Sequence, residues 1–149
     1  ILCLSGLAAG LNTTQKNEYN ITVLRGHSIS ELILSPRAID YTGIKQPDVV
    51  LALAQEGVDR RKDMFAQLDN DALVLQADGV EVPAGKARIH SMDLKSRKIK
   101  KPDWALASLA VMAGFNEIVS VEMLAAALKI KFKGKTLDAA LELIRQVRE

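Results

Sequence analysis

Five consecutive apolar residues, Val49-Val50-Leu51-Ala52-Leu53, restrict the folds open to this chain. Uninterrupted runs of this kind are typical of strands that are buried on both faces of a parallel sheet. Residues 72–77 predict a second buried strand, and residues 87–92 predict a third. Residues 58–68 place apolar side chains at helical spacing among charged ones, which predicts a surface helix. This order of elements is typical of an α/β domain.

The N-terminal part of the chain combines a helix with extended segments. Residues 1–10 predict the latter part of a helix with Gly10 at its C′ position, and residues 11–14 predict a short extended piece. Residues 28–34 interleave Ser and Glu with Ile and Leu, which predicts a strand at or near a sheet edge.

The last third of the chain is rich in Ala and Leu and predicts helices. Ser120 and Thr136 are candidate N-caps, since their hydroxyl oxygens can accept hydrogen bonds from free N–H groups of the first turn. The predicted helices are residues 104–115, 121–130 and 137–147. We therefore expect a single domain over residues 1–149, a three-layer α/β/α sandwich around a largely parallel or mixed sheet, with a helical C-terminal end.

Cysteine and histidine are too scarce for a metal centre. Cys3 is the only cysteine, so the chain can form no intramolecular disulfide and hold no iron–sulfur cluster. His27 and His90 lack the spacing of metal ligands, so we expect no metal. This usage fits a reducing cytoplasm. No apolar run approaches the ~20 residues of a transmembrane helix, and the apolar start of the chain lacks the basic residues of a signal peptide, so no membrane association is expected.

The loop Arg25-Gly26-His27-Ser28 is the first candidate for ligand contact. Gly26 lets the backbone approach a ligand closely, and Arg25 can bind a phosphate or carboxylate through two hydrogen bonds. The alternative is an ordinary turn with an exposed histidine, which spacing alone favours.

Gln55 and Glu56 are the second candidates, because they follow the first buried strand. Ligands of open parallel sheets bind at the carboxyl ends of the strands. Equally, these residues can be the polar start of a helix, where the charge of Glu56 is favourable.

Basic residues concentrate in two stretches, 95–101 and 129–135, and neither contains an acid. Such segregation can steer an acidic protein or a phosphorylated ligand toward one surface. The favoured alternative is a solvated loop and a lysine-rich helix C-terminus. The near absence of aromatic residues in both stretches argues against nucleic acid.

No known catalytic constellation is present. The chain has no nucleophile elbow, P-loop or metalloprotease motif, so no residue is assigned a catalytic role. Asp78-Gly79 resembles the start of a thiamine diphosphate motif, but the expected Asn does not follow, and a turn is predicted. Two alternatives remain open. One is a free-standing nucleotide-binding α/β enzyme, for which the sequence shows neither a glycine-rich loop nor an acidic ribose partner; the other is an interaction domain without a ligand.

Several short segments stand in a particular order. They are Gly10-Leu11-Asn12, Thr14-Gln15, Tyr19, Arg25-Gly26-His27-Ser28, Glu31-Leu32-Ile33-Leu34-Ser35, Pro47–Leu53, Gln55-Glu56-Gly57, Leu73–Asp78 and the Ala-rich helix 104–114. In this order the chain resembles, over essentially its whole length, the gamma subunit or gamma domain of 2-oxoacid:ferredoxin oxidoreductases. These are the pyruvate, 2-oxoglutarate and 2-ketoisovalerate enzymes.

The resemblance implies a supporting subunit. Enzymes of this family oxidatively decarboxylate a 2-oxoacid on thiamine diphosphate, pass electrons through iron–sulfur clusters to ferredoxin, and release an acyl-CoA. The resemblance implies that alpha, beta and ferredoxin-like subunits carry these cofactors and that this chain binds none alone, although it can help to receive coenzyme A. It also implies ligand or subunit contact for Arg25, Gly26, His27 and Ser28 and for Gln55, with Glu56 beside it.

The chain departs from the resembled family at its start. Members begin with a strand and a Gly-x-Gly-Gly-Gln-Gly loop that leads into the first helix, whereas Ile1 is already expected within that helix. We therefore expect residues 1–149 to lack a central strand and a phosphate-binding loop.

Overall fold

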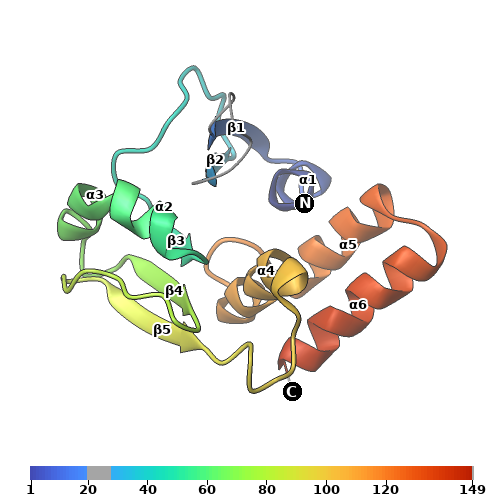
Figure 1. Cartoon of the computed structure of the whole chain (residues 1–149). Helices are drawn as coiled ribbons and strands as arrows, with labels where there is room; N and C mark the ends of the chain where they lie inside the picture. The colour runs from blue at the N-terminus through green and yellow to red at the C-terminus, as the bar shows by residue number, and fades with distance from the viewer. Residues whose placement is uncertain (20–27, 149) are drawn as a thin grey trace. The chain divides into compact units, whose positions relative to one another are not determined.

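The computed structural model describes residues 1–19 and 28–148, and it has the predicted α/β class (Figure 1). In chain order the elements are α1 (Leu2–Ala8), β1 (Asn12–Tyr19), β2 (Ser28–Ser35), β3 (Val49–Ala52), α2 (Gln55–Arg60), α3 (Lys62–Ala66), β4 (Leu73–Ala77), β5 (Arg88–Met92), the 3₁₀ helix η1 (Lys101–Asp103), α4 (Trp104–Phe115), α5 (Val121–Lys131) and α6 (Gly134–Arg148).

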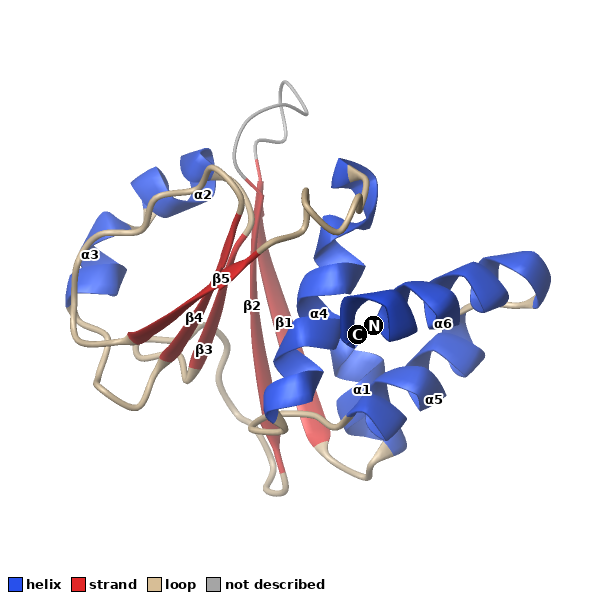
Figure 2. Cartoon of the chain, turned by 90° about the horizontal axis from the view of Figure 1, so that it is seen from below, coloured by secondary structure: helices blue, strands red, loops and turns tan. Residues whose placement is uncertain are grey.

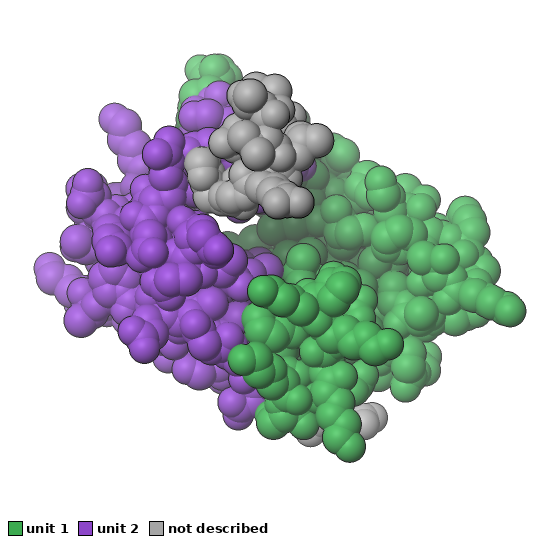
Figure 3. Space-filling view, in the orientation of Figure 1, with its two compact units in different colours: residues 1–14, 33–41, 94–149 green, residues 15–32, 42–93 purple. Residues whose placement is uncertain are grey.

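The chain separates into two compact units (Figure 3). Unit 1 comprises Ile1–Thr14, Ile33–Tyr41 and Leu94–Glu149, and unit 2 comprises Gln15–Leu32 and Thr42–Asp93. Neither unit is a continuous segment, because β1 and β2, which form a two-stranded sheet, each pass from one unit to the other.

Unit 2 contains the parallel sheet that the apolar runs predict. Its order is β3-β4-β5, and α2 and α3 cover one of its faces (Figure 2). Leu73 is the register partner of Val49 in β3 and of Arg88 in β5. The central strand β4 is almost completely buried, with Leu75 at 0% exposure, so the centre of this core follows the second apolar run.

The predicted burial of the other two strands is wrong. In β5, residues 88–91 are exposed, including Ile89 at 48%, and only Met92 is buried. In β3, only Ala52 is buried, and the other three residues are half-buried. Both strands are edges of the three-stranded sheet, so each has a neighbouring strand on one side only, which leaves its side chains more open to solvent than those of the central strand β4.

Two other predicted boundaries differ from the structure. The helix expected at 58–68 begins earlier, at Gln55, and is divided into α2 and α3 at Arg61, whose φ of −121° is not helical. The extended piece expected at 11–14 is the start of the eight-residue strand β1.

The end of α1 is the predicted glycine cap. Gly10 adopts a φ of +80°, which favours glycine. The N–H of Leu11 donates to the carbonyl of Gly6 (2.9 Å), and the N–H of Gly10 donates to the carbonyl of Leu7 (3.0 Å). These two bonds define a Schellman motif. Helix α1 packs against α5.

The C-terminal helices form the core of unit 1, where α4 packs against both α5 and α6. Ser120 is the N-cap of α5, as predicted: its hydroxyl accepts a hydrogen bond from the Met123 N–H (3.3 Å). The prediction for Thr136 is wrong, because α6 already begins at Gly134, whose φ of +53° suits glycine at the turn into the helix. No helix among residues 1–19 and 28–148 is long and apolar enough to cross a membrane.

Candidate functional site

Of the six residues that the sequence suggests for ligand or subunit contact, the structure describes Ser28, Gln55 and Glu56. Arg25, Gly26 and His27 lie outside the described residues. Ser28 is the exposed first residue of β2. Gln55 and Glu56 begin α2 just after the carboxyl end of β3, which is the position that the sequence predicts for them.

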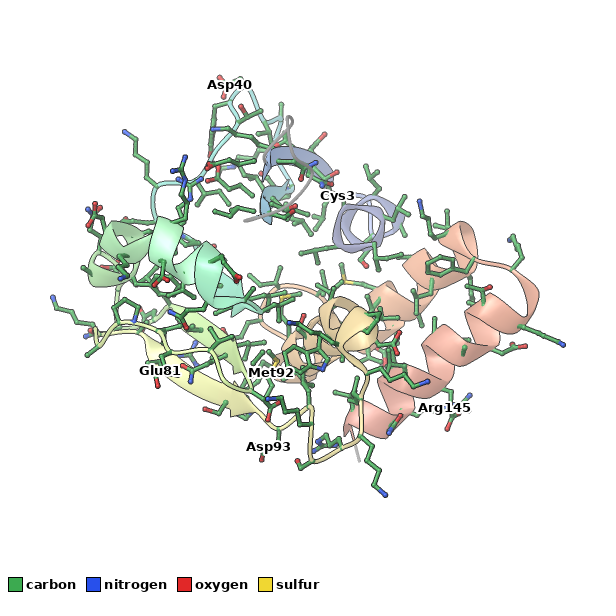
Figure 4. The ribbon with its side chains drawn as sticks, viewed as in Figure 1. Cys3, Asp40, Glu81, Met92, Asp93 and Arg145 are labelled. Atoms are coloured by element: carbon green, nitrogen blue, oxygen red, sulfur yellow. The ribbon has the colours of Figure 1, made fainter. Side chains whose placement is uncertain are left out.

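The side-chain amide of Gln55 joins the start of α2 to the loop after β4. Its Nε2 donates to the Glu81 carbonyl (3.1 Å), and its Oε1 accepts from the Glu81 N–H (2.8 Å). Glu81 is labelled in Figure 4. The same Nε2 donates to Asp59 Oδ1 (3.1 Å). This side chain therefore connects the carboxyl ends of two neighbouring parallel strands, and its amide already has partners within the chain.

The hydrogen bond from Gln55 also affects the charge of Asp59. This bond, followed by the hydrogen bond and positive charge of Lys62, lowers the pKa of the Asp59 carboxyl below its usual value of 3.8, although some desolvation opposes the change. Both interactions favour the ionised carboxylate. Asp59 is thus a fixed negative charge on α2, three residues after exposed Glu56. The Gln55 amide bonds to the Asp59 carboxylate and to the Glu81 backbone carbonyl.

Four charged residues connect the β1–β2 sheet to the junction of α2 and α3 within unit 2. Glu18 Oε1 pairs with Arg60 Nε at 3.1 Å, and Glu18 Oε2 pairs with Arg61 Nη2 at 2.7 Å. Arg61 Nη2 also pairs with Glu31 Oε1 at 3.2 Å. Arg61 and Glu31 are the less exposed pair, with side chains 33% and 18% exposed. The network ties the strands on both sides of residues 20–27 to the end of α2, the helix that begins with Gln55 and Glu56.

Glu31 also fixes the segment that leads from β2 to β3. Its Oε2 accepts a hydrogen bond from the Ile44 N–H at 3.3 Å. The preceding residue, Gly43, has a φ of +88°, and a Cβ there would lie 3.3 Å from the same oxygen. Sequence reasoning missed this network, because its partners are up to 43 residues apart and no local pattern links them.

Among residues 1–19 and 28–148, the geometry around α2 provides ion pairs and a hydrogen-bonded amide. Arg61, Glu18 and Glu31 are ion-paired, and Asp59 is bonded to the Gln55 amide. In the described part of the chain, no group of three or more His, Cys, Asp or Glu side chains is arranged to hold a metal ion.

The two basic stretches lie at opposite ends of α6. Arg97 Nη1 donates to the carbonyls of Gln146 (3.2 Å) and Val147 (2.9 Å) near the helix C-terminus. The other stretch, 129–135, ends in the first turn of the same helix. At 1.5 Å per residue these positions are roughly 20 Å apart, so the stretches do not form one continuous patch along α6.

Comparison with known proteins identifies the family. The model of the pyruvate ferredoxin/flavodoxin oxidoreductase family matches residues 1–149. The fold is similar to that of a keto/oxoacid ferredoxin oxidoreductase gamma subunit from Geobacter sulfurreducens PCA, with a TM-score of 0.75 and 18% identity over 98% of this chain and 85% of that chain. It is also similar to pyruvate oxidoreductase subunit PORC from Thermotoga maritima, with a TM-score of 0.68 and 17% identity over 99% and 85% of the two chains. No curated protein matches the sequence. The whole-chain match shows that this chain belongs to the pyruvate ferredoxin/flavodoxin oxidoreductase family.

Proposed function

We propose that this chain is the gamma subunit, or gamma domain, of a multi-subunit 2-oxoacid:ferredoxin oxidoreductase. The family match over residues 1–149 carries the proposal, and the fold shared with a gamma subunit and with subunit PORC supports it. In the proposed reaction a 2-oxoacid loses carbon dioxide, its acyl group passes to coenzyme A, and two electrons reduce ferredoxin. The substrate class is that of pyruvate, 2-oxoglutarate and 2-ketoisovalerate, and the proposed location is the cytoplasm.

The redox cofactors of such a complex belong, in this proposal, to other subunits. An iron–sulfur cluster requires several thiolate ligands, whereas this chain has only Cys3, whose Sγ lies 3.9 Å from the Thr14 carbonyl. Asp78-Gly79, which resembles the start of a thiamine diphosphate motif, is a turn after β4. We assign thiamine diphosphate and the clusters to alpha, beta and ferredoxin-like subunits.

The proposed role of the candidate residues is contact with those subunits or with coenzyme A. Arg25 offers a bidentate group for phosphate, next to Gly26, His27 and Ser28. Gln55 and Glu56 lie at the strand ends where ligands of parallel sheets bind. The ion pairs of Glu18 and Glu31 with Arg61 support this assignment, because they tie both strands that flank residues 20–27 to the residue that follows α2.

The direct test is anaerobic purification of the tagged protein from its own cells, followed by native mass spectrometry. Partner subunits that carry thiamine diphosphate and iron–sulfur clusters are the expected result. A lone monomer or homodimer would contradict the proposal and favour a free-standing nucleotide-binding enzyme or a ligand-free interaction domain.

The coenzyme A contact has a separate test in the purified complex. Arg25→Ala is expected to raise the KM for coenzyme A about tenfold with little change in kcat, as loss of a ground-state contact does. Arg37→Ala, which removes an exposed arginine just after β2, is the matched control and should leave both constants unchanged. Equal effects of the two substitutions would exclude a specific role for Arg25.

A further inference from the structure

The junction of α5 and α6 carries exposed charge of one sign only. We call residues 129–135 the α5–α6 elbow; it contains Lys129, Lys131, Lys133 and Lys135, all exposed, and no acidic residue. None of these four lysines is ion-paired within residues 1–19 and 28–148.

Local helix stability explains only part of this charge. Lys129 and Lys131 occupy the last turn of α5, where a positive charge complements the helix dipole. Lys133 Nζ donates to the Lys129 carbonyl at 3.1 Å and so caps the end of that helix. Lys135 has no such explanation: it lies in the first turn of α6, where the dipole favours acids, and that turn contains none.

The elbow also exposes an apolar side chain. Ile130 is 58% exposed between Lys129 and Lys131, and Phe132 is half-buried after them. Protein interfaces commonly place an apolar contact inside a polar rim. A rim made only of lysines is complementary to carboxylates on the partner, and these would also relieve the unfavourable charge at the start of α6.

We propose that the α5–α6 elbow docks onto an acidic face of another subunit, with Ile130 as its apolar contact. The identity of the partner as a subunit rests on the proposed function; the chemistry of its surface follows from the charges on this chain. The other basic stretch, 95–101, is the control, because two of its residues already make contacts within the chain. Arg97 caps the C-terminus of α6. The backbone carbonyl of buried Ile99 accepts a hydrogen bond from the Trp104 indole N–H (3.1 Å).

The first test maps contacts in the purified native complex with a zero-length carbodiimide, which joins lysine directly to a carboxylate. Expected cross-links run from the lysines of the elbow to Asp or Glu of one partner subunit, and exceed those from exposed Lys98, Lys100 and Lys101. Links from both stretches at equal frequency, or retention of nucleic acid in place of an acidic subunit, would overturn the proposal.

The second test separates docking from folding through Lys135→Glu. This change places an acid in the first turn of α6, so the chain should unfold at an equal or higher temperature. Native mass spectrometry at low ionic strength should nevertheless show that dissociation of this subunit from the complex becomes about fivefold more favourable. Lys100→Glu, an equal charge reversal in the other basic stretch, should leave dissociation unchanged.

The two proposals fail in different ways. A complex that contains this chain but ignores Lys135→Glu and lacks cross-links at the elbow overturns only the docking surface. A chain recovered without any partner overturns the subunit assignment and the docking surface together.

Discussion

Gly6 offers the sharpest test of the packing of α1. It is buried in the last turn of that helix, and a Cβ built on it would lie 2.8 Å from both Leu34 Cδ2 and Thr13 Cγ2. Carbon atoms pack best at about 3.5–4.0 Å, so a methyl group must displace both neighbours by roughly 1 Å. Thr13 is β-branched and therefore has little rotamer freedom with which to withdraw.

Two opposing terms decide the effect of Gly6→Ala on the free energy of unfolding. Overpacking of a buried site costs roughly 1–3 kcal/mol, whereas replacing glycine by alanine in a helix gains up to about 1 kcal/mol. We expect the steric term to win, with a net loss of about 1 kcal/mol. For a chain of this length that loss lowers Tm by about 2–4 °C in a calorimetric or circular dichroism melt.

Gly114→Ala is the matched control. Gly114 also lies in the last turn of its helix, α4, but no heavy atom of the residues that the structure describes is within 4 Å of the Cβ that alanine would add there. The propensity term therefore acts alone, and Tm should rise by a few degrees. If Gly6→Ala stabilised the chain as much as Gly114→Ala does, the close packing of α1 on Thr13 and Leu34 would be refuted.

Other predictions concern the side chains around α2. Gln55→Ala should lower the free energy of unfolding by only about 1 kcal/mol, because water can hydrogen-bond to the exposed groups that lose the amide. The same change should raise the pKa of Asp59 toward 3.8 in an NMR titration. Because the pKa of Asp59 is lowered in the folded chain, its contribution to stability is complete above pH 3.8 and is lost as the pH falls through the lower pKa of the folded state. Asp59→Asn should therefore remove this part of the pH dependence of urea unfolding. A double-mutant cycle with Glu31→Gln and Arg61→Gln should give a coupling energy of about 0.5–1 kcal/mol that decreases with added salt, and zero coupling at low salt would contradict the ion pair.

Local chemistry made much of the fold predictable. Gly10 ends α1 because a glycine can adopt the positive φ that closes a Schellman motif, and Ser120 starts α5 because its hydroxyl replaces a missing backbone acceptor. Both effects depend on residues within one or two turns. The break at Arg61 left no such signal, since neither proline nor glycine stands there.

Tertiary position was much harder to predict than element type. The apolar run of β4 and that of β3 are similar in composition, yet only β4 is central in the three-stranded sheet. The position of Gln55 at a strand end was predictable from sequence, whereas its pairing with Glu81 depends on the path of a loop 26 residues away. The ion pairs of Glu18 with Arg60 and Arg61 are equally invisible in the sequence, because charges far apart in the chain carry no pairing information.

The edge position of β3 affects how the newly synthesised chain assembles. Its four residues are apolar and half-buried or buried, and they include neither the lysine nor the proline with which edge strands commonly avoid pairing with other chains. In β5, at the other edge, Arg88 is present. An apolar edge strand can pair with its correct partner or with any extended chain nearby, and the pairing that forms depends on which encounter comes first. Synthesis together with its partner subunits would therefore protect this chain through timing as much as through affinity.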